Sequence, residues 1–146
     1  MAFSFHYLDK IAIADTAFEA RGDSPAELCM ASAQALIEVL ANASTVQHKW
    51  EQQFVFQEET LEDMLFEWLS AIVYIKDVEG VVFCDSIVTV TTSTAQKPWE
   101  AVCLLRGDRV NPMEQELGVD VKAITKHLYE VSQQGREWVA RVVIDT

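Results

Sequence analysis

Two long apolar segments with helix-start signals constrain the fold more than any other feature of this 146-residue sequence. The first begins with S-P-A-E at residues 24–27, a capping box with proline at the first helical position, and it predicts a helix over residues 25–41. In the second, Thr60 can cap a helix whose apolar residues recur at helical spacing over residues 61–75. Both segments are apolar around much of their circumference, so each helix is expected to be covered on two sides.

The rest of the sequence predicts strands, because it is rich in β-branched, aromatic and alternating residues. The expected strands span residues 3–8, 11–20, 50–57, 81–92, 99–106, 121–131 and 137–145, with the last four in a meander and a hairpin loop at residues 132–136. The order is roughly β-β-α-β-α-β-β-β-β, an α+β class with two helices packed between sheet layers. No linker or internal repeat interrupts it, which predicts a single domain over residues 1–146.

The charge balance limits the partners that such a domain can bind. Twenty-three acidic residues against 11 basic ones give a formal net charge of -12. A surface of this sign repels phosphate backbones, and no basic stripe is present to neutralise them. Direct high-affinity binding of nucleic acid is therefore not expected, whereas basic proteins and divalent cations are suitable partners.

The cysteines and the apolar segments indicate the cellular compartment. The chain has three cysteines, Cys29, Cys84 and Cys103, and no C-x-x-C motif. They are therefore predicted to be small buried residues and not disulfide partners or zinc ligands. The N-terminus lacks the basic and apolar regions of a signal peptide, and the most apolar stretch, residues 64–75, is too short to span a bilayer. A cytoplasmic protein without membrane association is expected.

Two aspartates stand out because they lie beside apolar residues. Strand alternation places Asp15 on the face of Ile11 and Ile13, where an ionised carboxylate is costly unless it is paired, hydrogen-bonded or bound to a metal. A bulge that carries Asp15 into water is the alternative. Asp145 follows the apolar residues 142–144, and a frayed polar terminus is its alternative explanation. Common catalytic motifs such as G-x-S-x-G, the P-loop, G-x-G-x-x-G and H-E-x-x-H do not occur.

Four segments, in order, resemble the archease family. Residues 14–22 read A-D-T-A-F-E-A-R-G, similar to a family opening in which H-T-A-D-V-G is followed by an alternating strand and glycine. Residues 61–69 read L-E-D-M-L-F-E-W-L, similar to L-x-x-L-L-x-x-W-L, and residues 121–127 read V-K-A-I-T-K-H, similar to V-K-A-V-T-Y-H. Residues 138–146 resemble the closing strand of the family, which ends in aspartate plus one residue.

The resemblance implies a divalent-metal site formed by Asp15, Asp145 and the terminal carboxylate of Thr146. Three carboxylates supply hard oxygen ligands, which suit Ca²⁺ best, or Mg²⁺ or Mn²⁺, rather than zinc. Lys122 matches a lysine that matters for activity in the family, and a solvated strand lysine is the alternative. His127 is expected to be a hydrogen-bonded structural histidine on the face of Ala123, Thr125 and Tyr129.

Two departures from the family pattern bear on metal affinity. Where the family has H-T-A-D, this chain has A-I-A-D at residues 12–15, so the histidine and the threonine are missing. After Gly107 the family has a Y-D-P-x-x-H-like segment, but here Asn111 places an amide where a carboxylate ligand can stand, and the histidine is absent. The expected fold is unaffected.

The resemblance implies an accessory protein without its own turnover. Archeases activate the GTP- and metal-dependent RNA ligase that joins tRNA halves and repairs broken RNA, by helping the ligase to become guanylylated and to turn over repeatedly. The alternative from another class is a general chaperone or binding module for an RNA-modifying enzyme such as a methyltransferase. A weaker one is a small metal-dependent hydrolase.

Overall fold

The computed structural model describes residues 3–8 and 15–146 of the chain. The predicted order of strands and long helices is confirmed, with a short 3-10 helix added after the first long helix. The elements in chain order are β1 (Phe3–Leu8), β2 (Asp15–Gly22), α1 (Pro25–Leu40), η1 (Ala43–Thr45), β3 (Trp50–Glu58), α2 (Leu61–Glu79), β4 (Val81–Thr92), β5 (Trp99–Arg109), β6 (Ala123–Gln134) and β7 (Glu137–Asp145).

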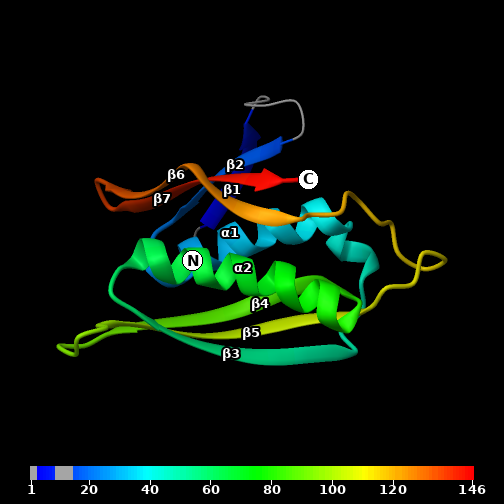
Figure 1. The fold of residues 1–146 in the computed structure, drawn as a ribbon, viewed down its shortest axis with the longest axis horizontal. Helices are drawn as coiled ribbons and strands as arrows, with labels where there is room; N and C mark the ends of the chain where they lie inside the picture. The colour runs from blue at the N-terminus through cyan, green and yellow to red at the C-terminus, as the bar shows by residue number, and fades with distance from the viewer. Residues whose placement is uncertain (1–2, 9–14) are drawn as a thin grey trace.

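The strands form two antiparallel sheets that enclose the helices. One sheet has the order β1-β2-β7-β6 and the other the order β3-β5-β4. Helices α1 and α2 lie between them (Figure 1), which confirms the α+β class with helices packed between sheet layers. The predicted four-strand meander is wrong. The hairpins β4–β5 and β6–β7 belong to different sheets, because the helix pair needs cover on both sides and each hairpin covers one.

Both helices begin at the predicted caps. The Ser24 hydroxyl accepts a hydrogen bond from the Glu27 amide at 3.2 Å, and the Thr60 hydroxyl accepts one from the Asp63 amide at 3.1 Å. Helix α2 continues past the predicted end at residue 75 and stops at Gly80, whose φ of 62° places it in the left-handed region that ends many helices. No helix among the described residues combines the length and apolar character needed to cross a bilayer.

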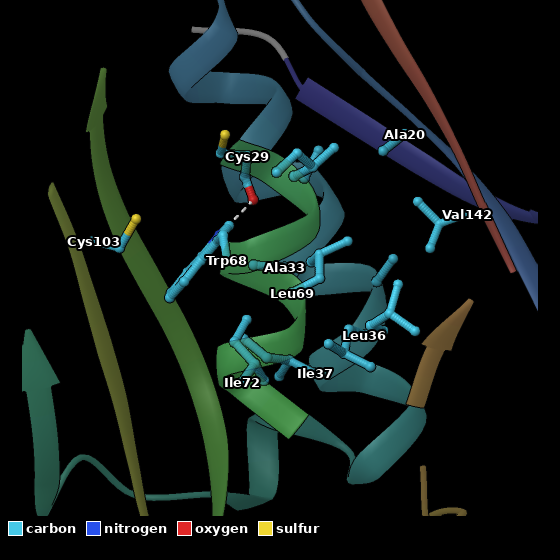
Figure 2. Packing of buried hydrophobic residues seen from close by; sticks show 14 of the residues in the cluster. Ala20, Cys29, Ala33, Leu36, Ile37, Trp68, Leu69, Ile72, Cys103 and Val142 are labelled. Carbon is cyan, nitrogen blue, oxygen red and sulfur yellow. Dashed lines mark hydrogen bonds between the residues drawn. The ribbon is translucent and has the colours of Figure 1, made fainter. Parts of the chain in front are cut away.

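The core lies between the two sheets and is centred on the helix pair. Trp68 of α2 is fully buried, and its Nε1–H donates a 3.2 Å hydrogen bond to the carbonyl of Cys29 in α1 (Figure 2). Ala20 and Val142 reach this core from the first sheet, and Cys103 reaches it from the second. Burial of a large apolar side chain stabilises a fold by about 1.5–3 kcal/mol, so covering both faces of the helices is a major part of the stability.

Two glycines are required by the local geometry. A Cβ at Gly22, the last residue of β2, would lie 2.5 Å from the backbone nitrogen of Leu28, so only glycine lets β2 approach the first turn of α1 this closely. Gly135 has a φ of 63° and forms, with Arg136, the two-residue turn between β6 and β7. The predicted hairpin is confirmed, with a shorter loop than expected.

The ends of the first sheet differ in detail from the predicted strands. The strand expected over residues 11–20 is described from Asp15 onward, and residues 11–14 lie outside the described parts. Strand β6 begins at Ala123 and is interrupted by a register shift between Thr125 and Glu130, where Leu128 has a φ of 56°. This bulge lies on an edge strand of the sheet, a common place for such irregularities.

Candidate functional site

The two aspartates that the sequence singles out stand opposite each other. Strands β2 and β7 are antiparallel neighbours, and their register pairs Asp15 with Asp145. Asp145 is the last residue of β7, so the pair lies at the C-terminal end of that strand, and Thr146 follows directly. Asp145 and Thr146 are half-buried. Asp15 is described by its place in β2, whereas its side chain lies outside the described parts.

The start of β6 adjoins the same end of the sheet. The backbone amide of Lys122 donates a 2.8 Å hydrogen bond to the carbonyl oxygen of Asp145, and Ala123 is the register partner of Asp145. The Lys122 side chain is exposed and borders a hollow that Tyr74 of α2 also lines. The four residues predicted to form the metal site and its functional contact, Asp15, Lys122, Asp145 and Thr146, therefore share one end of the first sheet.

A buried lysine anchors the segment that leads into Lys122. The ammonium of Lys76, near the end of α2, donates to Asp120 Oδ1 at 2.6 Å and to the carbonyl of Val121 at 3.0 Å, and it lies 2.9 Å from Asp77 Oδ1. The Lys76 side chain is only 8% exposed. Burial disfavours its charge, but the hydrogen bonds to Asp120 and Asp77 outweigh that effect and raise the pKa of Lys76.

Sequence reasoning missed Lys76, although a signal was present. Lys76 is spaced four residues from Ile72 and so continues the buried stripe of α2, where an apolar residue is the rule. A lysine at such a position requires acceptors that the fold supplies, because a buried unpaired ammonium is costly. Two of its acceptors, Asp120 and the Val121 carbonyl, come from the 110–122 segment, which the periodicity of α2 alone does not reveal.

The metal site itself stays a prediction. Residues directly opposed in an antiparallel pair project from the same face, which is the arrangement two carboxylates need to share one ion. Among the described side chains, no three histidines, cysteines, aspartates or glutamates gather in a way that could hold a metal. The predicted set depends on the Asp15 side chain, which is not described, and on the Thr146 carboxylate.

His127 lies on the surface, and Asn111 takes part in a local turn. His127 is exposed and makes no hydrogen bond within the described parts of the chain, so the expected hydrogen-bonded structural histidine is wrong. The register shift after Thr125 breaks the alternation on which that expectation rested. The Asn111 side-chain oxygen accepts a hydrogen bond from the Met113 backbone amide at 3.1 Å. The backbone amide of Asn111 donates a hydrogen bond to Gln115 Oε1 at 2.8 Å.

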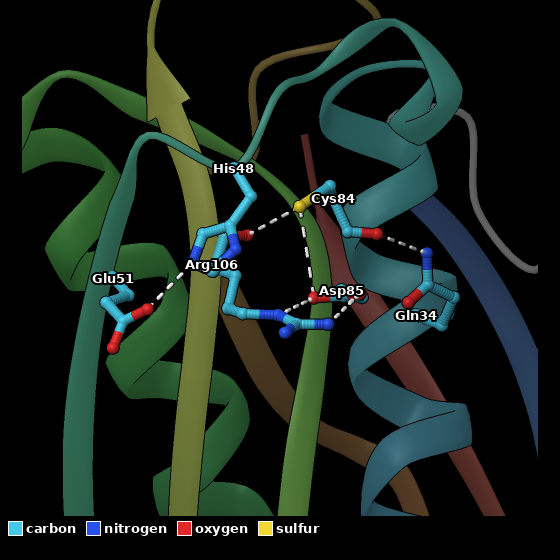
Figure 3. A network of polar contacts seen from close by, with 6 residues as sticks. All are labelled: Gln34, His48, Glu51, Cys84, Asp85 and Arg106. Atoms are coloured by element: carbon cyan, nitrogen blue, oxygen red, sulfur yellow. Dashed lines mark hydrogen bonds and ion pairs between the residues drawn. The ribbon is translucent and has the colours of Figure 1, made fainter.

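A second polar network lies on the other sheet. The Arg106 guanidinium binds Asp85 through two hydrogen bonds of 2.6 Å, and His48 Nε2 lies 2.7 Å from Glu51 Oε1 (Figure 3). The hydrogen bond from Arg106 lowers the pKa of the Asp85 carboxyl. The Cys84 thiol donates to the carbonyl of Arg106. The Arg106 contacts join β4 and β5, and the His48–Glu51 contact lies at the start of β3, so both are the contacts of a structural ion-pair network.

None of the cysteines is activated as a nucleophile. All three are free, with Cys29 and Cys103 buried and Cys84 half-buried. Burial raises the pKa of each thiol, to about 12 for Cys103. The thiols therefore stay protonated at neutral pH, and the predicted role as small packed residues is confirmed for Cys29 and Cys103.

The described chain is an α+β domain with a helix pair between a four-stranded and a three-stranded antiparallel sheet. The sequence model of the Archease protein family (MTH1598/TM1083) matches residues 5–146. The chain belongs to the archease family.

Individual relatives agree with this assignment. Protein archease of Pyrococcus abyssi is 32% identical over 134 residues, covering 90% of this chain and 92% of its own length. Protein archease of Methanopyrus kandleri is 27% identical over 132 residues, covering 90% of this chain and 93% of its own.

Solved structures share the fold. The solution structure of protein 1598 of Methanobacterium thermoautotrophicum matches with a TM-score of 0.80 at 25% identity, over 97% of this chain and 98% of the other. The crystal structure of an archease of Thermotoga maritima, described as a possible chaperone, matches in fold with a TM-score of 0.62 at 21% identity, over 97% of this chain and all of the other.

Proposed function

We propose that this archease is a cytoplasmic accessory protein without its own turnover that activates a GTP- and metal-dependent RNA ligase, promoting guanylylation of the ligase and repeated turnover. The observation that carries the proposal is the register of β2 and β7, which sets Asp15 opposite Asp145 in a chain whose family match covers residues 5–146.

In the proposed site, Asp15, Asp145 and the Thr146 carboxylate hold one divalent cation. The donor set fits Ca²⁺, Mg²⁺ or Mn²⁺, because all three ligands are anionic oxygens. When bound, such an ion supplies a positive charge that can bind phosphate oxygens. Asp145 is placed by its pairing with β2 and by the hydrogen bond from Lys122, so its position depends on both neighbouring segments.

The electrostatics support a protein partner with a basic cleft. A protein of net charge -12 associates readily with a basic, RNA-binding surface and does not compete for the RNA itself. The exposed Lys122 ammonium, beside the aspartate end of the sheet, can contact a phosphate or a carboxylate in that complex.

The test is a ligation time course with RNA in excess over ligase, together with a label-transfer assay for guanylylated ligase. The protein is expected to convert a reaction that stalls after about one cycle into one with many cycles. Asp15→Asn and Asp145→Asn should abolish the stimulation, whereas Glu59→Gln, which alters an exposed carboxylate just before α2, should leave it intact. Stimulation that survives both aspartate variants would exclude the metal mechanism but keep the partner.

A general chaperone or binding module is the second candidate, favoured by the description of the Thermotoga maritima relative as a possible chaperone. In that case the wild-type protein should not stimulate ligation, and it should instead protect a client such as an RNA methyltransferase from aggregation. The aspartate variants should protect the client as well as the wild type does.

A further inference from the structure

Two adjoining hollows flank the C-terminal half of α2. Each has a volume of about 310 Å³, and Asp77 borders both. One lies between α2, the end of α1 and the 110–120 segment, and the other lies between α2 and the start of β6. We call the two together the α2 groove. In Figure 1, α2 faces the viewer with no described element in front of it, and the yellow segment after β5 lies beyond its C-terminal end.

The walls of the α2 groove carry exposed apolar side chains, and this exposure does not stabilise the monomer. Tyr74 is 67% exposed and Val119 is 55% exposed, and Val110 and Leu117 beside Val119 are also exposed. Apolar side chains gathered in one concave place mark an interaction site more often than scattered ones do.

The charges of the α2 groove select the kind of partner. Asp77 and Asp120 both bind the ammonium of Lys76, so this cluster of three groups carries one uncompensated negative charge. Asp120 is 79% exposed and available to a second cation. The exposed ammonium of Lys122, two residues along the chain from Asp120, lines the second hollow, so the groove also presents one positive charge.

Other occupants fit these charges poorly. A second copy of the chain would bring another protein of net charge -12 against the same acidic rim, and nucleic acids and anionic membranes would be repelled as well. A polypeptide with apolar anchors and a nearby lysine or arginine matches both the walls and the uncompensated carboxylate.

We propose that the α2 groove binds an amphipathic basic segment of a partner protein, with apolar side chains in the two hollows and a cation on Asp120. The groove adjoins the predicted metal site, because Lys122 lines one hollow and its amide is bonded to Asp145. The inference goes beyond the proposed function, since it requires neither a bound metal nor a ligase as the partner.

The test uses the full ¹⁵N-labelled chain and a synthetic helical peptide of about 18 residues, built from leucine and lysine at amphipathic spacing. Saturable shifts are expected at the amides of Tyr74, Val119 and Lys122. Val119→Ser and Tyr74→Ser should each weaken binding about fivefold to tenfold. Val55→Ser, at a position of similar exposure on the other sheet, should not change it. Thermal melting verifies that the variants remain folded.

Two results would overturn the proposal. One is amide shifts spread over the whole acidic surface, with Val119→Ser and the wild type binding the peptide equally tightly. This would mean that the peptide binds by charge attraction alone and not in the α2 groove. The other is equally tight binding of a matched peptide built from leucine and glutamate, which would show that Asp120 does not select a basic partner. The peptide titration contains neither a divalent cation nor a ligase. Its result therefore does not depend on whether the proposed ligase activation is correct.

Discussion

Asp15 and Asp145 are register partners at the C-terminal end of β7, although they stand near opposite ends of the sequence. If their carboxylates share one cation, Asp145→Asn should weaken Ca²⁺, Mg²⁺ and Mn²⁺ binding by about tenfold or more, because a neutral amide replaces an anionic ligand. Calorimetric titration measures this, with Glu59→Gln as the control. Unchanged cation affinity in Asp145→Asn would exclude the site as proposed.

The Lys76 anchor predicts a local as well as a global effect. Lys76→Met should lower the free energy of unfolding by about 1–2 kcal/mol, since two exposed aspartates can be rehydrated but the carbonyl of Val121 loses its donor. The amide of Lys122 should then exchange hydrogen faster than the amides of β5. Lys49→Met, an exposed lysine, is the control. Equal exchange at Lys122 in the two variants would show that Lys76 does not hold this segment.

The pair Asp85–Arg106 predicts a pH-dependent contribution to stability. Arg106 lowers the pKa of Asp85 in the folded state, so the contribution is fully present above the unfolded aspartate pKa of about 3.9 and is lost as the pH falls through the lower folded value. Because the pair is partly exposed, Asp85→Asn should cost about 1 kcal/mol or less at pH 7. Urea denaturation from pH 7 to pH 3 should show the difference from wild type shrinking below about pH 4.

Much of the fold could be predicted because its signals are local. The capping hydroxyls of Ser24 and Thr60 and the helical spacing of the apolar residues define both helices without any tertiary information. The partition of the hairpins between two sheets could not be predicted in this way. It depends on which face of the helix pair each hairpin covers, and nothing within a strand specifies that choice.

In the candidate site, too, residues with a local sequence signal could be predicted, whereas residues whose partners are distant in sequence could not. Asp15 and Asp145 could be singled out because acids beside apolar runs are unusual, and the family resemblance linked them. The role of Lys76 could not be predicted, because its acceptors Asp120 and Val121 are distant in sequence. The exposure of His127 follows from a bulge that sequence alternation does not reveal.

The close approach of β2 to α1 predicts that Gly22→Ala destabilises the fold. The added Cβ would lie 2.5 Å from the Leu28 nitrogen, which is backbone and cannot rotate away, so the strand or the helix must shift. The expected loss is about 1–3 kcal/mol, typical of overpacking in a close contact. Thermal or urea denaturation measures it. Gly135→Ala is a useful comparison, because its cost comes from the φ of 63° and not from a clash.

The last prediction separates cation binding from activation. Lys122→Met should leave cation affinity nearly unchanged, since an ammonium is not a metal ligand and its backbone amide still bonds Asp145. It should nonetheless reduce stimulation of the ligase about tenfold, if the ammonium contacts a phosphate or a carboxylate of the complex. Lys122→Arg should restore part of the activity, because it keeps the charge with a different geometry. Lys97→Met, an exposed lysine in the loop between β4 and β5, should behave as the wild type. Loss of both cation binding and stimulation in Lys122→Met would instead indicate that the start of β6 shapes the metal site, and full stimulation would exclude a functional contact at this lysine.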